Sequence, residues 1–195
     1  MKYPNGLAKV YNNQVNYKNR GMNLEDDLNQ TNNYYLVTDR AVIYKKPTPV
    51  TIVKVDFKSR EDAVIKEAYF KTPSTTDYNG IYNGKYIDFE AKETLNTEYF
   101  PLRNIHDHQI EHLRKVLNHG GIAFLIVRFT NLNVTYFLEA KYLLEFLEKN
   151  TRKSIPISYF EDKGYILQER FNPRLDYLRI IDIIYFEKGE FVWKN

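Results

Sequence analysis

The sequence predicts an α/β protein in which helices flank a mixed β-sheet, and three of its segments carry this prediction. Residues 122–129 form a nearly continuous apolar run, which is typical of a strand buried on both faces. Residues 105–119 carry apolar side chains at helical spacing and end at Gly120-Gly121, which stops a helix. A β-rich segment at 134–138 precedes a helical one at 141–149. This mixture of strands and helices favours layers of sheet and helix around one core.

The first twenty residues carry basic side chains and no acidic one, and they lack hydrophobic periodicity. We therefore expect residues 1–20 to be a flexible basic tail, either solvated or lying along phosphates. A helix is predicted to follow, because Asn23 is a favourable N-cap and the acidic residues 25–27 suit the positive end of a helix dipole. The last helix is predicted at residues 175–186.

The segment 45–71 is predicted to leave the main sheet. Residues 40–44 and 51–57 are β-rich, but Pro47 and Pro49 lie between them, and two prolines so close together do not fit a central strand. The segment also has seven basic and four acidic side chains, so its net charge is 7 − 4 = +3. It is either a basic excursion from the sheet or a solvated face.

Two Asn-Gly pairs, Asn79-Gly80 and Asn83-Gly84, follow this segment. Asn-Gly is a strong turn signal, because both residues tolerate positive φ angles. We expect the two pairs to bracket a short hairpin that leads into a strand at residues 85–93.

The composition excludes several classes of protein. Because the chain has no cysteine, it has no disulfides, thiolate nucleophiles or cysteine-based zinc sites. The formal net charge of +3 does not by itself indicate a nucleic-acid partner. No apolar run is long enough to span a membrane and the N-terminus lacks a signal-peptide pattern, so we expect a cytoplasmic protein without a membrane partner. The length suits one domain, placed at residues 21–195.

Polar residues alternate with apolar ones along residues 86–92. Side chains two positions apart share one face of a strand, so Asp88, Glu90 and Lys92 are expected on one face and their neighbours in the core. Carboxylate oxygens suit Mg²⁺, and a lysine beside them can orient water or offset charge on a phosphate. The pattern is typical either of a metal-dependent phosphodiester hydrolase of the PD-(D/E)xK type or of a solvated strand face.

The Glu-x-Lys pattern is weak alone, because it occurs at Glu90, Glu139 and Glu161, and Glu139-Ala140-Lys141 even repeats the Glu-Ala-Lys triplet. Glu90 differs from the others in having Asp77 upstream, across a turn-rich segment that can bring the two acids together. His106, His108 and His112 have a metal-like spacing, but the His-Glu-x-x-His helix of zinc proteases is absent. These histidines are expected to contact DNA or water.

Several long runs resemble the RecU family of Holliday junction resolvases. They are residues 20–22, 24–28, 45–50, 72–80, 86–94, 105–109 and 173–177. The resemblance spans nearly the whole chain beyond residue 20. It implies a restriction-endonuclease-like core with a protruding stalk at about residues 45–71, in which helices flank a mixed sheet.

The resemblance also implies a set of site residues. The metal ligands would be Thr75, Asp77, Glu90 and Gln109, all of which offer oxygen atoms. Lys92 would stabilise the transition state, so the catalytic residues would be Asp77, Glu90 and Lys92. The cofactor would be Mg²⁺, with Mn²⁺ as a substitute. Asp88 is expected to be a neighbour of this site, and Glu25 either a residue that contacts the ligands from outside or an extra ligand.

The implied activity is the symmetric cleavage of four-way DNA junctions during recombination and repair. The stalk would enter the junction, and DNA contacts are expected at Lys45, Lys46, Arg60, Lys66, Phe70 and Lys71. The implied partners are a second copy of the chain in a homodimer, a recombinase and branch-migration proteins. The alternative is a module that binds junctions or modulates a recombinase without cutting.

Overall fold

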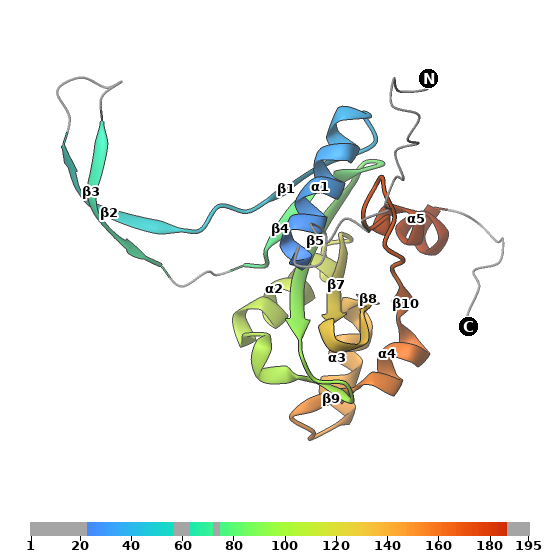
Figure 1. The fold of residues 1–195 in the computed structure, drawn as a ribbon. Helices are drawn as coiled ribbons and strands as arrows, with labels where there is room; N and C mark the ends of the chain where they lie inside the picture. The colour runs from blue at the N-terminus through green and yellow to red at the C-terminus, as the bar shows by residue number, and fades with distance from the viewer. Residues whose placement is uncertain (1–22, 57–62, 72–74, 187–195) are drawn as a thin grey trace, which may run out of the picture.

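The computed structural model describes residues 23–56, 63–71 and 75–186, with a six-stranded mixed sheet at its centre (Figure 1). The strands lie in the order β1-β4-β5-β7-β8-β10; β5 and β7 run parallel, and the other neighbours are antiparallel. Their bounds are β1 Val42–Lys45, β4 Tyr78–Tyr82, β5 Lys85–Thr94, β7 Ile122–Phe129, β8 Val134–Glu139 and β10 Tyr165–Ile166. The predicted α/β class with a mixed sheet is confirmed.

Helices cover both faces of this sheet. One apolar core joins it to α1 and α5, and a second joins it to α2, α3 and α4. The helices are α1 Leu24–Val37, α2 Asp107–Asn118, α3 Ala140–Lys149, α4 Ile157–Lys163 and α5 Tyr177–Ile181, which continues into the π-helical turn η4 Asp182–Phe186. Shorter elements are β6 Tyr99–Pro101 paired with β9 Ser154–Pro156, and the 3-10 turns η2 Leu102–Asn104 and η3 Thr130–Leu132.

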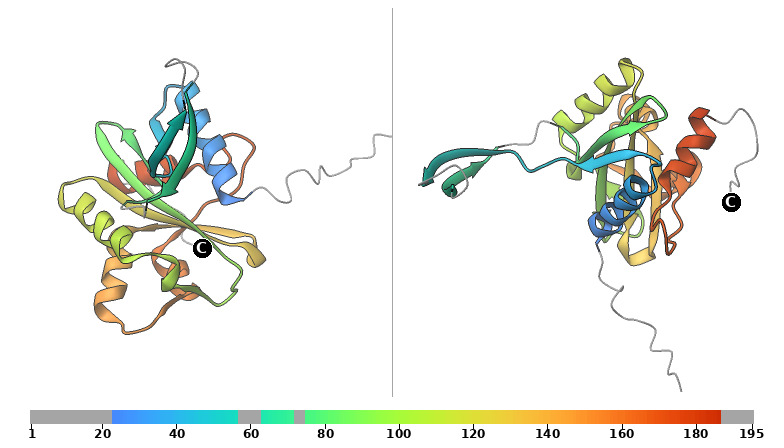
Figure 2. Two further views of the ribbon diagram at one scale, coloured as in Figure 1. Left: turned by 90° about the vertical axis from the view of Figure 1, so that its left-hand side faces the viewer. Right: turned by 90° about the horizontal axis from the view of Figure 1, so that it is seen from above.

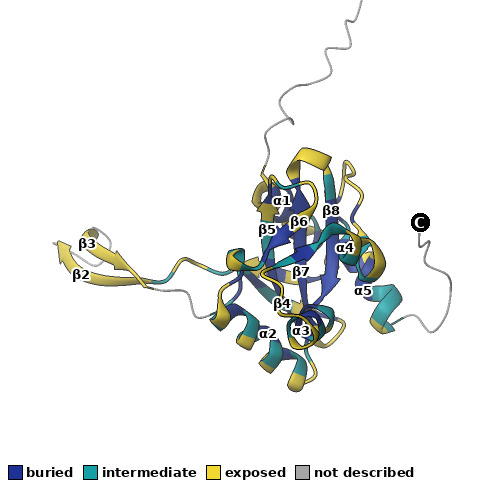
Figure 3. Cartoon of the chain, turned by 90° about the horizontal axis from the view of Figure 1, so that it is seen from below, coloured by how far each residue is buried: buried dark blue, intermediate teal, exposed yellow. Residues whose placement is uncertain are grey.

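The strand β7 is the centre of both cores. All of its residues are buried (Figure 3). Its apolar side chains alternate between the two faces of the sheet. Ile122, Phe124 and Ile126 pack towards α1 and α5, while Leu125 and Val127 pack towards α2 and α3. A strand covered on both faces favours apolar side chains, and the one charged residue of β7, Arg128, is buried against Asp27 at 2.6 Å. The predicted central strand is confirmed.

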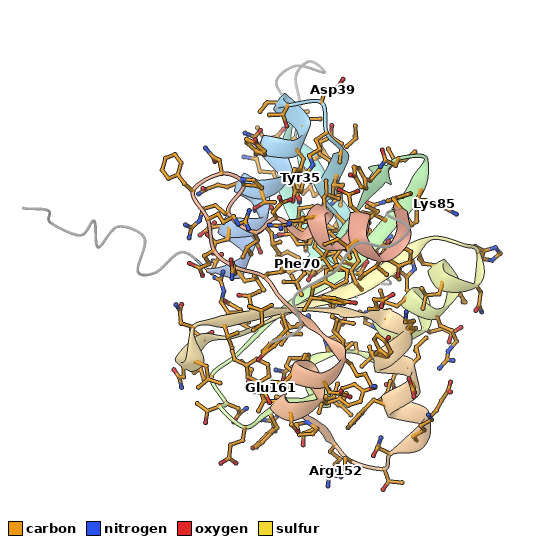
Figure 4. The ribbon with its side chains drawn as sticks, turned by 90° about the vertical axis from the view of Figure 1, so that its right-hand side faces the viewer. Tyr35, Asp39, Phe70, Lys85, Arg152 and Glu161 are labelled. Carbon is orange, nitrogen blue, oxygen red and sulfur yellow. The ribbon has the colours of Figure 1, made fainter. Side chains whose placement is uncertain are left out.

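The predicted first and last helices are also confirmed. The Asn23 side chain caps α1 by accepting a hydrogen bond from the Asp26 amide at 2.8 Å. Tyr35 of α1 then lies against the last helix (Figure 4): its hydroxyl donates to Asp176 at 2.8 Å, and its ring meets that of Tyr177 edge-on. The two ends of the described chain thus close over the same face of the sheet.

One of the two predicted Asn-Gly turns is wrong. Asn83 and Gly84 have φ angles of 46° and 73° and form the turn between β4 and β5, as expected. Asn79 and Gly80 lie inside β4, paired with β1. A Cβ atom on Gly80 would stand 2.1 Å from the carbonyl oxygen of Val42. Glycine is needed at position 80 because strands β1 and β4 approach closely there, and this residue does not form a turn.

Replacing Gly80 with alanine is expected to lower the free energy of unfolding by about 3 kcal/mol, because the neighbouring backbone must move. The control is Gly84→Ala, where nothing lies within 4 Å and the cost is conformational, about 1 kcal/mol. Urea unfolding measures both changes. Equal losses would show that strand contact is not what requires glycine at position 80.

A separate two-stranded ribbon, β2 (Val50–Asp56) with β3 (Val64–Phe70), projects from the sheet (Figure 2). Every described residue of both strands is exposed. At the base of the ribbon, the Lys71 amide donates to the Pro49 carbonyl at 2.9 Å. The protruding stalk of the predicted fold is therefore present. Within the described ranges, no helix combines the length and apolar character needed to cross a membrane.

Candidate active site

A cleft of about 710 Å³ opens where the ribbon joins the sheet. Its walls come from the start of α1, the base of the ribbon, the segment before β4, the second half of β5 and the start of α2. The lining residues are 23–25, 45–49, 75–78, 91–93, His106, His108 and Gln109. The cleft thus gathers three of the predicted metal ligands, Thr75, Asp77 and Gln109, together with Lys92.

Asp77 is placed by the end of strand pairing between β4 and β5. The ladder reaches Tyr78 opposite Phe89 and stops there. Beyond it, the Ala91 amide donates to the Oδ2 atom of Asp77 at 3.3 Å, so a side-chain acceptor replaces the backbone carbonyl that strand pairing would supply. The structure therefore brings Asp77 to the strand that carries Glu90.

Glu90 is fully buried on β5, beneath the floor of the cleft. Its Oε1 atom accepts hydrogen bonds from Gln109 Nε2 at 2.7 Å and from Lys92 Nζ at 2.5 Å. Its Oε2 atom is buried without a hydrogen-bond partner in the described structure. Burial and the neighbouring charge of Asp77 raise the pKa of Glu90 to about 8, against the opposing effect of Lys92.

Gln109 is placed by the N-terminus of α2. Its Oε1 atom accepts from the His106 amide at 3.0 Å, which completes a capping arrangement, and its Nε2 atom points to Glu90. An amide oxygen has two acceptor positions, so one stays available for the predicted cation. The amphipathic helix that brings Gln109 to the sheet begins at Asp107, close to its predicted start.

Asp88 shares the predicted strand face with Glu90 and Lys92, but it is engaged elsewhere. Its carboxylate accepts hydrogen bonds from Lys46 Nζ at 2.8 Å, from the Tyr86 hydroxyl at 2.8 Å and from the Thr76 hydroxyl, and it lies 3.0 Å from His112 Nε2. It is a neighbour of the site, as expected. The ammonium of Lys46, predicted to contact DNA, lies on this buried carboxylate. His112, expected to contact DNA or water, does so as well.

Glu25 and Lys45 face each other at the rim of the cleft. Their charged atoms are 2.5 Å apart, and both residues line the cleft. Glu25 therefore approaches the site from the first turn of α1, with Lys45 as its partner. Asn23, the N-cap of the same helix, lines the cleft beside it.

The other predicted DNA contacts lie on the ribbon. Lys66 is exposed and 3.8 Å from Asp56, while the Phe70 side chain is 83% exposed. Lys71 is exposed at the ribbon base. Arg60 lies outside the described residues. Lys66, Phe70 and Lys71 therefore face solvent away from the sheet, whereas Lys45 and Lys46 line the cleft.

The family model described as Recombination protein U (RecU) matches residues 19–183 of the chain. A protein of Bacillus cereus (strain B4264) named Holliday junction resolvase RecU is 52% identical over 199 residues, covering 95% of this chain and 98% of the relative. A protein of Geobacillus sp. (strain WCH70) with the same name is 54% identical over 196 residues, with the same coverage. The solved structure of Archaeoglobus fulgidus Hjc, a Holliday junction resolvase, aligns at 13% identity with a TM-score of 0.39, covering 66% of this chain and 84% of that one.

Proposed function

Since the chain belongs to the RecU family, we propose that it is an endonuclease that resolves four-way DNA junctions by metal-dependent hydrolysis of phosphodiester bonds. The runner-up is a module that binds junctions and does not cut them. One observation favours cutting: Asp77, which lines a cleft, neighbours the buried carboxyl group of Glu90, and Lys92 contacts Glu90 from the same cleft.

The donor set fits a divalent cation. The unpartnered Oε2 atom of Glu90 is a buried acceptor beside a second carboxylate, and binding a cation there would offset the repulsion between the two acids. Among the described residues, no three histidine, aspartate or glutamate side chains converge as a metal cluster. Thr75, Gln109 and water would complete the coordination, which suits Mg²⁺ because that ion keeps several waters and uses few carboxylates.

The proposed roles follow from this placement. A bound Mg²⁺ or Mn²⁺ supplies Lewis-acid stabilisation of the phosphate and makes water more acidic. Asp77 and Glu90 hold the cation, and Gln109 fixes the carboxylate of Glu90 through its amide. The Lys92 ammonium, which contacts Glu90 at 2.5 Å, lines the cleft and stabilises negative charge that develops on the phosphate.

The ribbon is proposed to select the junction. Its exposed bases, with Lys45 at its base, would contact phosphates, while Phe70 would stack on unpaired bases at the crossover. Arg60 is proposed to act with them. Since a four-way junction is cut on two strands, we propose a homodimer that presents two sites in symmetric positions. A protein with this task would act in the cytoplasm, where bacterial DNA lies.

The test is cleavage of a synthetic four-way junction in the presence of Mg²⁺. Paired nicks at symmetric positions are expected, with no cutting of linear duplex of the same sequence. Binding should weaken steeply with salt, because the contacts are mainly to phosphates. Mn²⁺ should replace Mg²⁺, and a chelator should stop cleavage without releasing the junction.

Two results would contradict the proposal. Tight junction binding without nicks at any Mg²⁺ or Mn²⁺ concentration would favour the non-cutting module. Cutting of plain duplex at defined sites would indicate a restriction-type nuclease instead.

A further inference from the structure

Asp88 gathers side chains from three segments besides its own strand. It has no exposed surface, although it lies two residues from Glu90 on the same face of β5. The partners are Lys46 from the ribbon base, Thr76 from the segment before β4, His112 from α2 and Tyr86 from β5 itself. We call these five residues the Asp88 cluster. Lys46 Nζ also donates to the Thr76 hydroxyl at 2.9 Å, which closes the cluster.

Two members of the Asp88 cluster, Thr76 and Lys46, adjoin the proposed metal ligand Asp77. Thr76 lies between Thr75 and Asp77 in the sequence. The backbone amide of Lys46 donates to the carbonyl of Asp77 at 2.7 Å. The position of Asp77 is therefore fixed from two sides by groups that Asp88 holds.

The helix α2 is attached to β5 by two parallel side-chain contacts. Gln109 reaches Glu90 at 2.7 Å, and His112, about one turn further along α2, reaches Asp88 at 3.0 Å. Two such contacts set both the rotation of the helix and its position along the strand. Loss of the second contact would leave the Gln109–Glu90 hydrogen bond as the one remaining member of this pair of contacts.

Lys46 connects this arrangement to the ribbon. It lies between β1 and β2, only four residues before the ribbon begins at Val50. Its side chain is 17% exposed, and its ammonium is held by a carboxylate with no exposure at all. Separating a buried pair of charges leaves both without compensation, so movement of the ribbon base must carry Asp77 and β5 with it.

We propose that Asp88 and Lys46 are positioning residues that couple the seating of DNA on the ribbon to the placement of Asp77 and Glu90. The proposal rests on the function proposed above. It assigns to Lys46 a role in catalysis through Asp77 and Asp88, in place of a contact with DNA phosphates.

The first test is Asp88→Asn. An amide nitrogen cannot accept hydrogen bonds, so the variant loses contacts to Lys46, His112 or Thr76. The expected result is a fall in kcat of about 10-fold to 100-fold and a roughly 10-fold weaker affinity for Mn²⁺ by calorimetry. Junction affinity without metal should stay within about twofold, because the ribbon surface is unchanged.

The second test is Lys46→Met, alone and combined with Asp88→Asn. Each single variant should lower kcat, and the double variant should be no worse than the more damaging single one, because the two act as a unit. A phosphate-binding lysine would behave differently: Lys46→Met would weaken junction affinity, and the salt dependence of binding would become less steep. That outcome would overturn the assignment.

The matched control is Glu139→Gln. Glu139 is also a buried strand carboxylate held by a lysine and a tyrosine, Lys141 at 2.9 Å and Tyr185 at 2.7 Å, and it does not line the cleft. Both variants should lose thermal stability, but only Asp88→Asn should lose kcat and Mn²⁺ affinity. If the two variants show the same changes in stability, kcat and Mn²⁺ affinity, Asp88 only stabilises the fold and the proposal is refuted.

A readout without cleavage separates this proposal from the proposed function. Junction binding in the absence of metal should slow amide hydrogen exchange in residues 75–91 of the wild type, but not of Lys46→Met. If the wild type binds Mn²⁺ and the junction but makes no nicks, the proposed function fails. The hydrogen-exchange rates and the Mn²⁺ affinities of the variants then still test whether Lys46 and Asp88 couple DNA binding to the site. If exchange slows equally in both proteins, the coupling is refuted even when cleavage is normal.

Discussion

Replacing Asp77 with asparagine is expected to lower the rate of junction cleavage by at least about 1,000-fold, equivalent to roughly 4 kcal/mol of transition-state stabilisation. The substitution removes the carboxylate of Asp77, whose negative charge neighbours the carboxyl group of Glu90. It keeps an oxygen atom that can accept the Ala91 amide, so the end of the β4–β5 pairing should survive. Junction affinity without metal should stay within about twofold.

Gel-based cleavage and mobility shift of the same labelled junction measure the two effects separately. The control is Asp39→Asn, the same substitution at an exposed residue that does not line the cleft (Figure 4). It should leave both measurements unchanged. Normal cleavage by Asp77→Asn would show that the assigned site is wrong, even if the family activity is present.

Replacing Glu90 with glutamine is expected to abolish cleavage and to stabilise the metal-free protein. The lost carboxylate is a proposed ligand, so the rate should fall by at least about 100-fold. The gain in stability follows from burial, because the raised pKa of about 8 means that the ionised form is unfavourable in the folded protein. Removing it should raise the free energy of unfolding by roughly 5 kcal/mol at alkaline pH, because the pKa is raised from 4.5 to about 8.

The stability of the wild type should fall as pH rises. The ordinary pKa of the group is 4.5, so between pH 4.5 and about 8 the folded protein binds a proton that the unfolded chain has released. The wild type therefore loses stability as pH rises through that window, and the loss is complete above about pH 8. The difference between wild type and Glu90→Gln should be absent below pH 4.5 and largest above pH 8.

Urea unfolding in a chelating buffer at several pH values gives the measurement. Glu139→Gln is the control, because Glu139-Ala140-Lys141 repeats the motif and its acid is also buried. That variant should still cut the junction. A stability difference for Glu90→Gln that does not change with pH would mean that burial of the charge is not its cause.

Much of the site could be predicted from local patterns. Alternation along β5 places Asp88, Glu90 and Lys92 on one face, and the turn at Asn83-Gly84 folds β4 back along β5 so that Asp77 arrives at Ala91. These relations depend on residues near one another in the sequence, where strand geometry and turn chemistry act directly.

The Asp88 cluster could not be predicted in the same way. Lys46 lies 42 residues from Asp88 and His112 lies 24 away, and the contacts exist only because the ribbon base and α2 pack on one strand. A lysine next to a proline in a basic segment gives no local sign of burial. The short helix α4 was also missed, since only seven residues carry its pattern. Gly80 shows that a strong turn signal can yield to strand packing.

The exposed ribbon has a consequence for how such a chain can change. None of its described strand residues takes part in either core, and along the chain residues 46–49 precede β2 and residues 71–77 follow β3. Its length and surface can therefore vary without repacking the protein, whereas the connection that contains Lys46 cannot. Selection can then change which branched DNA the ribbon binds without changing the chemistry of the cleft, provided that the connection containing Lys46 is preserved.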